Sequence, residues 1–353
     1  MKHKYPALLV LICFFQFIAC KKESQPTVSQ PQHIALLNFS INGEIANANI
    51  DTTSNTITVA VLHTLNMHSL TANFSLTGQT KAIMNNVSVS SGTTSDFSKE
   101  VIFIISSDDN KYSKSFKVDV QTDLAYFGLT GAIVSEKSLN KSYNFYLDQF
   151  DGSTYQNINC GPAVTTMSVK WADSTFKGTP ASARQTIPAK GGWWYTTDVQ
   201  NYLQMNGINS VIVSQSNLQQ LVQQTIDNNN QLILCLDMGY VPYDGTYYHH
   251  VQKFYQTYGA GIGHFLLVKG YKQTSNNFYL EIYDPYTDHQ TYTGLFDEEP
   301  RGKDRYYAAA DITTATNAWW PFAIVVAPKG QQVTSSTKFT INSLAKIPAA
   351  MGR

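Results

Sequence analysis

Hydrophobic and polar positions alternate with a period of two between residues 34 and 121. The clearest runs are residues 57–62, 70–76, 101–105 and 115–120, each alternating or β-branched, with clusters of Asn, Asp, Gly and Ser between them. Successive side chains of a strand point to opposite faces, so this spacing predicts several short antiparallel strands. We therefore expect an all-β sandwich over residues 34–121. His63 and His68 are expected at its surface or in turns.

After a bridging segment at residues 121–141, aromatic residues become denser and helical periodicity appears. Apolar residues at spacings of three and four predict a helix over residues 160–171. Further helices are expected at residues 197–206, capped by Thr196 or Thr197, and at residues 217–226, capped by Ser216. Three later apolar runs predict strands: residues 231–237, 264–270 and 278–284. Helices followed by a sheet indicate an α+β domain over residues 140–328, and residues 329–353 are expected to form a loose tail.

The first twenty residues have the pattern of a targeting segment. A basic start, with Lys2 and Lys4, precedes an almost unbroken apolar run from Ala7 to Ile18, and Ala19 and Cys20 follow it. The run is too short to span a membrane and has the length of a signal-peptide core.

The segment ending at Cys20 resembles the lipobox of bacterial lipoproteins, in which this cysteine is acylated and becomes the new N-terminus. The Ser-, Gln- and Pro-rich residues 21–33 are then a flexible tether. Ig-like modules often follow such tethers, and the alternating pattern over residues 34–121 resembles one. The resemblance implies a lipid-anchored protein of the cell envelope, at the outer membrane or cell surface, with the membrane as a partner. An ordinary cleaved signal with a chance cysteine is the alternative.

The composition argues against nucleic-acid binding and permits one disulfide. The formal net charge is zero and only 14% of residues are charged, so no basic stripe could follow a nucleic-acid backbone. Two of the four cysteines, Cys160 and Cys235, lie beyond the signal segment. In an oxidising compartment these two could form one disulfide.

Cys160 has the surroundings of a nucleophile. It stands in Asn-Cys-Gly-Pro-Ala at the start of the first predicted helix, where the helix dipole favours a thiolate. Pro162 suits the first helical turn, and Gly161 would let a substrate backbone approach the sulfur. Cys235 lies in an apolar run, where a buried thiol is ordinary.

A thiolate nucleophile needs an acid/base partner, and His264 is the best placed candidate. It opens an apolar strand after the glycine-rich residues 259–263, and the next predicted strand ends at Asp284. Strands joined by a short loop are antiparallel neighbours, so the start of one lies beside the end of the other. Hence His264 and Asp284 are expected side by side. A core histidine without a catalytic role remains the alternative for His264.

Three motifs occur in this order: Cys-Gly-Pro-Ala at a helix start, Gly-His-Phe-Leu-Leu-Val-Lys-Gly-Tyr, and Tyr-Asp-Pro. In this order they are similar to the motifs of bacteriocin-processing, double-glycine leader peptidase-like members of the papain-fold cysteine peptidases. The resemblance covers roughly residues 143–328. It implies a papain-like domain with Cys160 as nucleophile, His264 as acid/base and Asp284 as its orienting acceptor, and no cofactor. It also implies a Gln upstream of the cysteine in the oxyanion hole; Gln149 matches that position, and Gln156 is the alternative.

The expected function is hydrolysis of peptide bonds in a peptide or protein substrate outside the cytoplasm. The same fold could instead carry a cell-wall peptide amidase or acyltransferase, and a surface binding module with a vestigial site is the alternative from another class. His249 and His250 are rival bases in the Tyr-rich segment 240–258. A metal site from these two and His289 lacks the usual ligand spacing, so none is expected.

Overall fold

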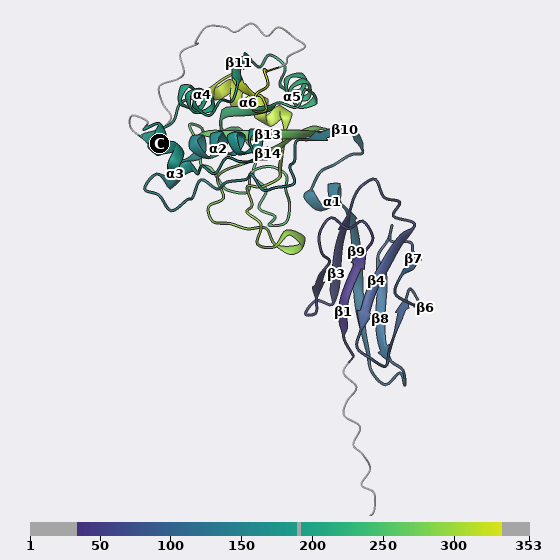
Figure 1. Cartoon of the computed structure of the whole chain (residues 1–353). Coiled ribbons are helices and arrows are strands. Elements are labelled where there is room, and N and C mark those ends of the chain that lie inside the picture. The colour runs from purple at the N-terminus through teal and green to yellow at the C-terminus, as the bar shows by residue number, and fades with distance from the viewer. Residues whose placement is uncertain (1–33, 189–191, 334–353) are drawn as a thin grey trace, which may run out of the picture.

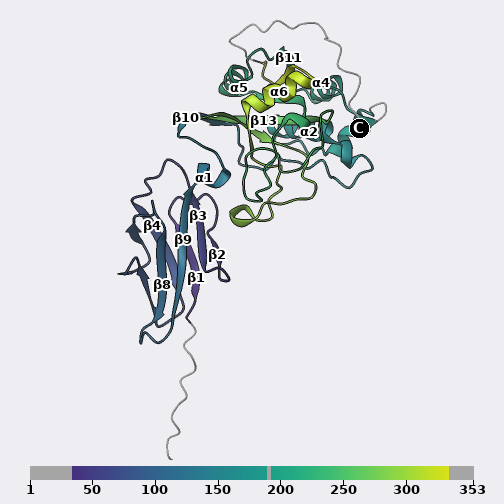
Figure 2. The same cartoon turned by 180° about the vertical axis from the view of Figure 1, so that it is seen from behind.

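The computed structural model describes residues 34–188 and 192–333, which form two parts, rich in β-sheet and with few helices. The first part lies below the second in Figure 1, and Figure 2 shows the same arrangement from behind. The expected signal segment, the lipidation site Cys20 and the tether all lie outside the described residues. So does the expected tail beyond residue 333.

The first part consists of two facing sheets around an apolar core. One sheet has the order β1-β4-β7 and the other β2-β3-β9-β8-β5-β6. Their strands are β1 (Leu36–Ile41), β2 (Asn49–Asp51), β3 (Thr56–Val61), β4 (Leu70–Leu76), β5 (Thr80–Met84), β6 (Val87–Val89), β7 (Thr93–Ser95), β8 (Val101–Ser107) and β9 (Ser113–Thr122). The four strands expected from alternation are confirmed as β3, β4, β8 and β9. All pairs are antiparallel except β3 with β9, which is parallel.

The bridging segment is structured. It contains α1 (Asp123–Phe127), capped by Thr122, and β10 (Ile133–Ser138), which pairs with β13 of the second part. A third apolar cluster joins the parts, with Ala60 of the sandwich packed among α1 and residues of the second part. His63 and His68 both lie in turns, as expected, and His68 is exposed. His63 also makes contacts that were not expected: its Nδ1 lies 2.9 Å from Asp123 and its Nε2 3.4 Å from Glu136.

The second part is built on a seven-stranded antiparallel sheet of order β11-β16-β12-β13-β14-β15, with β10 also paired to β13. Its strands are β11 (Ser210–Ser214), β12 (Gln231–Asp237), β13 (Gly263–Thr274), β14 (Phe278–Tyr283), β15 (Arg305–Ala308) and β16 (Phe322–Val326). The strands expected from apolar runs are confirmed as β12, β13 and β14. β12 and β14 are buried at every position, which explains why both are nearly continuous apolar runs.

Five helices pack on this sheet or beside it: α2 (Cys160–Ala172), α3 (Pro180–Thr186), α4 (Thr196–Met205), α5 (Leu218–Asp227) and α6 (Ala309–Trp319). The three expected helices are confirmed as α2, α4 and α5, but both cap assignments are wrong. Tyr195 is the N-cap of α4, where Asp198 accepts the Tyr195 N–H at 2.8 Å, and Asn217 caps α5 by accepting the Gln220 N–H. α2 packs against β13, which holds Cys160 next to the middle of the sheet.

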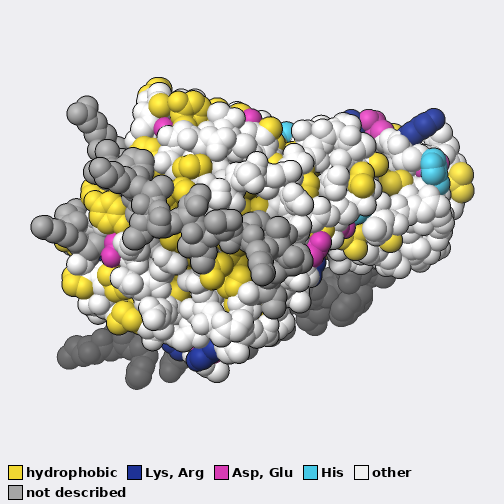
Figure 3. Space-filling view, turned by 90° about the horizontal axis from the view of Figure 1, so that it is seen from above, with side chains coloured by type: hydrophobic (Ala, Val, Ile, Leu, Met, Phe, Trp, Pro, Cys, Tyr) yellow, Lys and Arg dark blue, Asp and Glu magenta, His cyan; other side chains and the backbone are white. Residues whose placement is uncertain are grey.

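Charged groups are sparse on the face of the molecule seen in Figure 3, where Lys, Arg, Asp and Glu side chains are scattered. Among the described residues, no helix combines the length and apolar character needed to cross a membrane. The first residues of the expected tail lie against the second part: Lys329 Nζ is 2.6 Å from Asp173 Oδ2.

Candidate active site

Cys160 is the first residue of α2, at the base of a cleft. The residue is 6% exposed, and no side chain caps the helix at Asn159. The partial positive charge of the helix N-terminus can therefore act on the Cys160 thiol. The need for glycine at position 161 comes from packing, since a Cβ there would lie 2.8 Å from Cβ of Trp194. This is a different reason from the substrate approach expected from the sequence.

Arg184 holds the chain that leads into Cys160. This buried guanidinium donates from Nη2 to the Ile158 carbonyl at 2.7 Å and from Nε to the Asn159 side chain. It also lies over the ring of Tyr155, 4.8 Å from its centroid. Arg184 therefore fixes the turn before α2, a role that its sequence context does not reveal.

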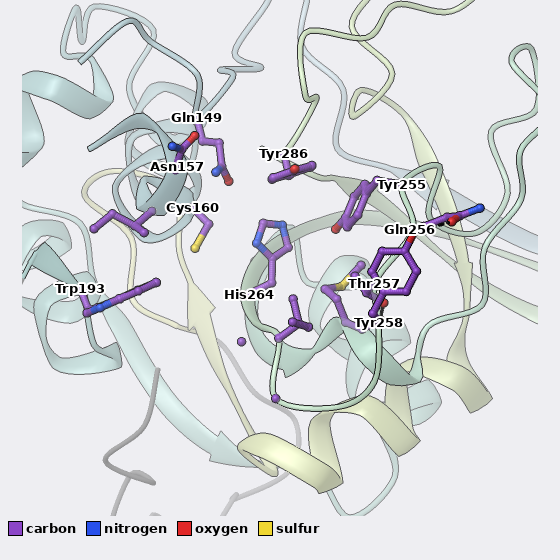
Figure 4. Close-up of a pocket in the computed structure, with 15 residues that line it drawn as sticks. Gln149, Asn157, Cys160, Trp193, Tyr255, Gln256, Thr257, Tyr258, His264 and Tyr286 are labelled. Atoms are coloured by element: carbon purple, nitrogen blue, oxygen red, sulfur yellow. Dashed lines mark hydrogen bonds between the residues drawn. The ribbon is translucent and has the colours of Figure 1, made fainter. Parts of the chain in front are cut away.

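His264 and Asp284 lie at neighbouring ends of β13 and β14, which pair in antiparallel register with Leu267 opposite Tyr283. His264 Nε2 is 2.8 Å from Asp284 Oδ1, and both side chains are buried. Figure 4 shows the His264 ring facing Cys160 across the cleft. The structure thus brings together the three residues that the sequence singled out, while their catalytic roles stay a prediction.

The site favours a charged pair. Burial by itself raises the pKa of Cys160, but the hydrogen bond and charge of His264 and two backbone N–H groups outweigh it and bring that pKa below its ordinary value. Burial likewise opposes protonation of His264, yet the Asp284 carboxylate and Cys160 raise the pKa of His264 to about 10. Both directions favour a thiolate beside an imidazolium over the neutral pair.

Asp284 accepts four hydrogen bonds. Oδ1 accepts from His264 and, at 2.9 Å, from the Tyr286 N–H, while Oδ2 accepts from the hydroxyls of Tyr307 at 2.8 Å and Tyr255 at 3.1 Å. Burial, followed by the charge of Asp284, raises the pKa of both tyrosines well above their usual range, so both remain protonated donors. Sequence reasoning missed them, because Tyr255 comes from a loop and Tyr307 from β15.

Gln149 lines the cleft on the Cys160 side, whereas Gln156 does not line it. Gln149 is 2% exposed, and its Nε2 donates to the Gln156 carbonyl at 3.1 Å, which leaves a second N–H on the same nitrogen. The Gln156 side chain accepts from the Gly152 N–H instead. Of the two glutamines, Gln149 is therefore the one that lies in the cleft, and its role as an oxyanion donor stays a prediction.

The cleft between these residues has a volume of about 340 Å³. Its wall at residues 259–263 is held by Asp237, whose carboxylate accepts N–H groups of Gly261 at 2.6 Å and Ile262 at 3.0 Å. Gly259 and Gly261 have φ of 80° and 95°, conformations that glycine tolerates best. The glycine-rich stretch before His264 therefore forms a bend held by Asp237, a further residue that the sequence did not single out.

The disulfide alternative does not hold, since Cys160 and Cys235 are both free thiols. Cys235 lies within β12 and is 2% exposed. Burial, with a smaller contribution from Cys160, raises the pKa of Cys235 well above its ordinary value. Of these two cysteines, only Cys160 is thus disposed to form a thiolate.

The rival histidines lie elsewhere. His250 is stacked on Tyr292, with ring centroids 4.0 Å apart, and burial lowers its pKa to about 3. His249 pairs with Asp244 at 2.8 Å, and His289 packs on Phe150. Among the residues that the structure describes, no group of three or more His, Cys, Asp or Glu side chains could hold a metal ion.

One family model matches part of the chain. The family model described as SGBP, N-terminal matches residues 36–120, which is the sandwich of the first part. No curated protein matches the chain.

Several solved structures are weakly similar. The peptidase domain of Streptococcus ComA is 16% identical, covering 52% of this chain and 96% of its own, with a TM-score of 0.27. A structure described as a C39-like peptidase from Bacillus anthracis is 12% identical, covering 56% and 98%, with a TM-score of 0.29. One described as a glycoside hydrolase from Bacteroides thetaiotaomicron is 10% identical, covering 86% and 91%, with a TM-score of 0.23.

Proposed function

We propose that this chain is a cysteine peptidase that hydrolyses peptide bonds through Cys160, His264 and Asp284. The observation that carries the proposal is the arrangement of these three groups: a thiol at a helix N-terminus faces a buried imidazole whose Nε2 is 2.8 Å from a carboxylate. A positioned base beside a nucleophile, itself oriented by a third group, is the arrangement that nucleophilic catalysis requires.

The proposed reaction is acyl transfer to water in two steps. The Cys160 thiolate attacks the peptide carbonyl carbon and forms a C–S bond, and the oxyanion accepts hydrogen bonds from Gln149 and the Cys160 N–H. The C–N bond then breaks as His264 gives its proton to the leaving amine. Since Nε2 is engaged by Asp284, Nδ1 is the ring nitrogen that serves Cys160. In the second step His264 takes a proton from water, whose oxygen attacks the thioester and releases the thiolate.

The proposal also covers the domain organisation and the location of the protein in the cell. We assign residues 140–328 to a papain-like α+β peptidase domain and residues 34–121 to an Ig-like sandwich. Residues 1–20 act as a lipoprotein signal peptide with Cys20 acylated, so that the protein is anchored at the outer membrane or cell surface. The match of residues 36–120 to the N-terminal module of SGBP proteins supports a place on the cell surface.

The proposal is tested by incubating the full chain with a proteome-derived peptide mixture and identifying new termini by mass spectrometry. Cleavages are expected with the wild type and absent with Cys160→Ala and His264→Ala. Cys235→Ala serves as the matched control, because it removes the other free thiol of the second part and should leave the cleavage pattern unchanged. Cleavage that persists in Cys160→Ala would contradict the proposal.

A surface glycan-binding protein with an inactive cleft is the second candidate, favoured by the SGBP match over residues 36–120. It predicts retention of the Cys160→Ala variant on immobilised polysaccharide and no peptide cleavage by the wild type. A wall-peptide amidase or acyltransferase on the same fold would instead release or transfer acyl groups from peptidoglycan fragments.

A further inference from the structure

The side chains that line the cleft are uncharged apart from the Cys160–His264 pair. No Lys, Arg, Asp or Glu is among the described residues that line it. Trp193 lies on the Cys160 side, and Tyr255, Tyr258 and Tyr286 lie on the His264 side (Figure 4). Aromatic rings therefore flank the position of the scissile bond on both sides.

Lys253 and Arg184, which bond to residues that line the cleft, are already engaged in hydrogen bonds. Lys253 is 3% exposed, and its ammonium donates to the Met238 carbonyl and the Thr257 hydroxyl. Arg184 donates to backbone carbonyls and to Asn159 beneath the cleft. Neither side chain lines the cleft, and the cationic groups of both donate to oxygen atoms of the protein.

Carboxylates also lie near the cleft. Burial raises the pKa of Tyr286, and the exposed Asp288 nearby raises it further. Asp237 lies behind the wall at residues 259–263, with its oxygens accepting backbone N–H groups. An anionic group entering the cleft would lose hydration, while the His264 imidazolium that lines the cleft is already paired with Cys160 and Asp284. Entry of a second anion is therefore unfavourable.

We infer that the cleft selects peptides whose residues next to the scissile bond are uncharged and apolar or aromatic, and that it rejects carboxylates there. This inference rests on the proposed peptidase function and names its substrate class. It also separates the protein from enzymes of wall peptides, because those peptides carry free carboxylates close to their amide bonds.

The test begins with the peptide that the full chain cleaves best in the mixture described above. Synthetic versions carry Gln or Glu at each of the two positions on either side of the cleaved bond, which changes the charge but hardly the size. We expect kcat/KM for each Glu peptide to be at most about one tenth of that for the matching Gln peptide, since an unpaired charge must be desolvated. A neutral apolar residue such as Leu should be accepted at least as well as Gln.

Gln256 allows a matched change in the protein, because it is exposed and lines the cleft. Gln256→Lys should narrow the preference for Gln over Glu peptides roughly threefold, and Gln256→Glu should widen it, as expected for one charge near the surface. Equal kcat/KM for Gln and Glu peptides in the wild type would overturn the inference and leave the peptidase proposal intact. Absence of any cleavage above the Cys160→Ala level would overturn both.

Discussion

Replacing Asp284 with Asn is expected to weaken catalysis without abolishing it. The two oxygens of Asp284 face different partners: Oδ1 accepts from His264 and the Tyr286 N–H, and Oδ2 accepts from the hydroxyls of Tyr255 and Tyr307. In Asp284→Asn the amide oxygen can stay at the Oδ1 position. The amide N–H groups then face two hydroxyls, which can rotate and accept. The substitution therefore keeps the hydrogen bond that orients His264.

What the substitution removes is charge. Asp284 is the largest favourable contribution to the raised pKa of His264, so that pKa should fall from about 10 when the carboxylate is lost. A hydrogen bond to a charged acceptor is worth about 1.5–3 kcal/mol and a neutral one about 0.5–1.5 kcal/mol. Asp284→Asn loses the difference in free energy between these two hydrogen bonds, and it also lowers the fraction of enzyme in the thiolate–imidazolium form. We therefore expect kcat/KM to decrease roughly ten- to hundredfold, which corresponds to about 1.4–2.7 kcal/mol.

The size of the loss distinguishes two resting states. In a neutral Ser–His pair the carboxylate selects the imidazole tautomer, and the same substitution costs about four orders of magnitude. In a thiolate–imidazolium pair both ring nitrogens are already protonated, so there is no tautomer to select. Asp284→Ala removes the acceptor and leaves two buried hydroxyls without it, so it should lose more activity than Asp284→Asn.

The measurement is kcat/KM of the wild type and of each Asp284 variant on one cleaved peptide, with circular dichroism to establish that each variant is folded. Asp297→Asn is the matched control, because Asp297 is an exposed carboxylate outside the cleft, and its activity should equal that of the wild type. A folded Asp284→Asn variant as inactive as Cys160→Ala would refute the charged resting pair. Unchanged kcat/KM would remove Asp284 from the site.

Four further outcomes are expected. Iodoacetamide at neutral pH should alkylate Cys160 at least roughly tenfold faster than Cys235, because only the Cys160 pKa is lowered; a Cys160–Cys235 disulfide in peptide maps would contradict this. Activity requires Cys160 deprotonated and His264 protonated, so kcat/KM should fall at low pH as the thiolate gains its proton and at high pH near 10; an alkaline limb near 6.5 would refute the pair. Tyr307→Phe removes one hydrogen-bond donor from the Asp284 carboxylate, which should raise the pKa of His264 further. The alkaline limb of the kcat/KM profile should then move to higher pH while kcat/KM falls roughly threefold, and an unmoved limb would mean that Tyr307 is only structural. Radiolabelled fatty acid should enter the wild type and not Cys20→Ala, and equal labelling would exclude the anchor.

Much of the site could be predicted because the positions of its residues follow from short segments of the sequence. A helix start places Cys160, and two strands joined by a short loop place His264 beside Asp284. Both arguments need only neighbouring elements of the chain. Strands β3, β4, β8 and β9 of the first part followed from alternation for the same reason, since each buries positions on one face.

The supporting groups could not be predicted, because they depend on pairings between distant segments. Tyr307 reaches Asp284 only because β15 pairs with β14, and Tyr255 arrives on a loop with no periodic pattern. β15 and α6 were not anticipated at all. The pairing of β10 with β13 and the contacts of His63 at the junction likewise depend on how the two parts meet.

The central claim is that Cys160 forms an acyl-enzyme with help from His264. Its most direct test is rapid acid quenching of the full chain during turnover of a cleaved peptide, followed by peptide mapping. We predict a thioester of the N-terminal peptide fragment on Cys160, present in the wild type and absent in His264→Ala. A peptide cleaved at the same rate with no acyl group on Cys160, or with the group on another residue, would contradict the account.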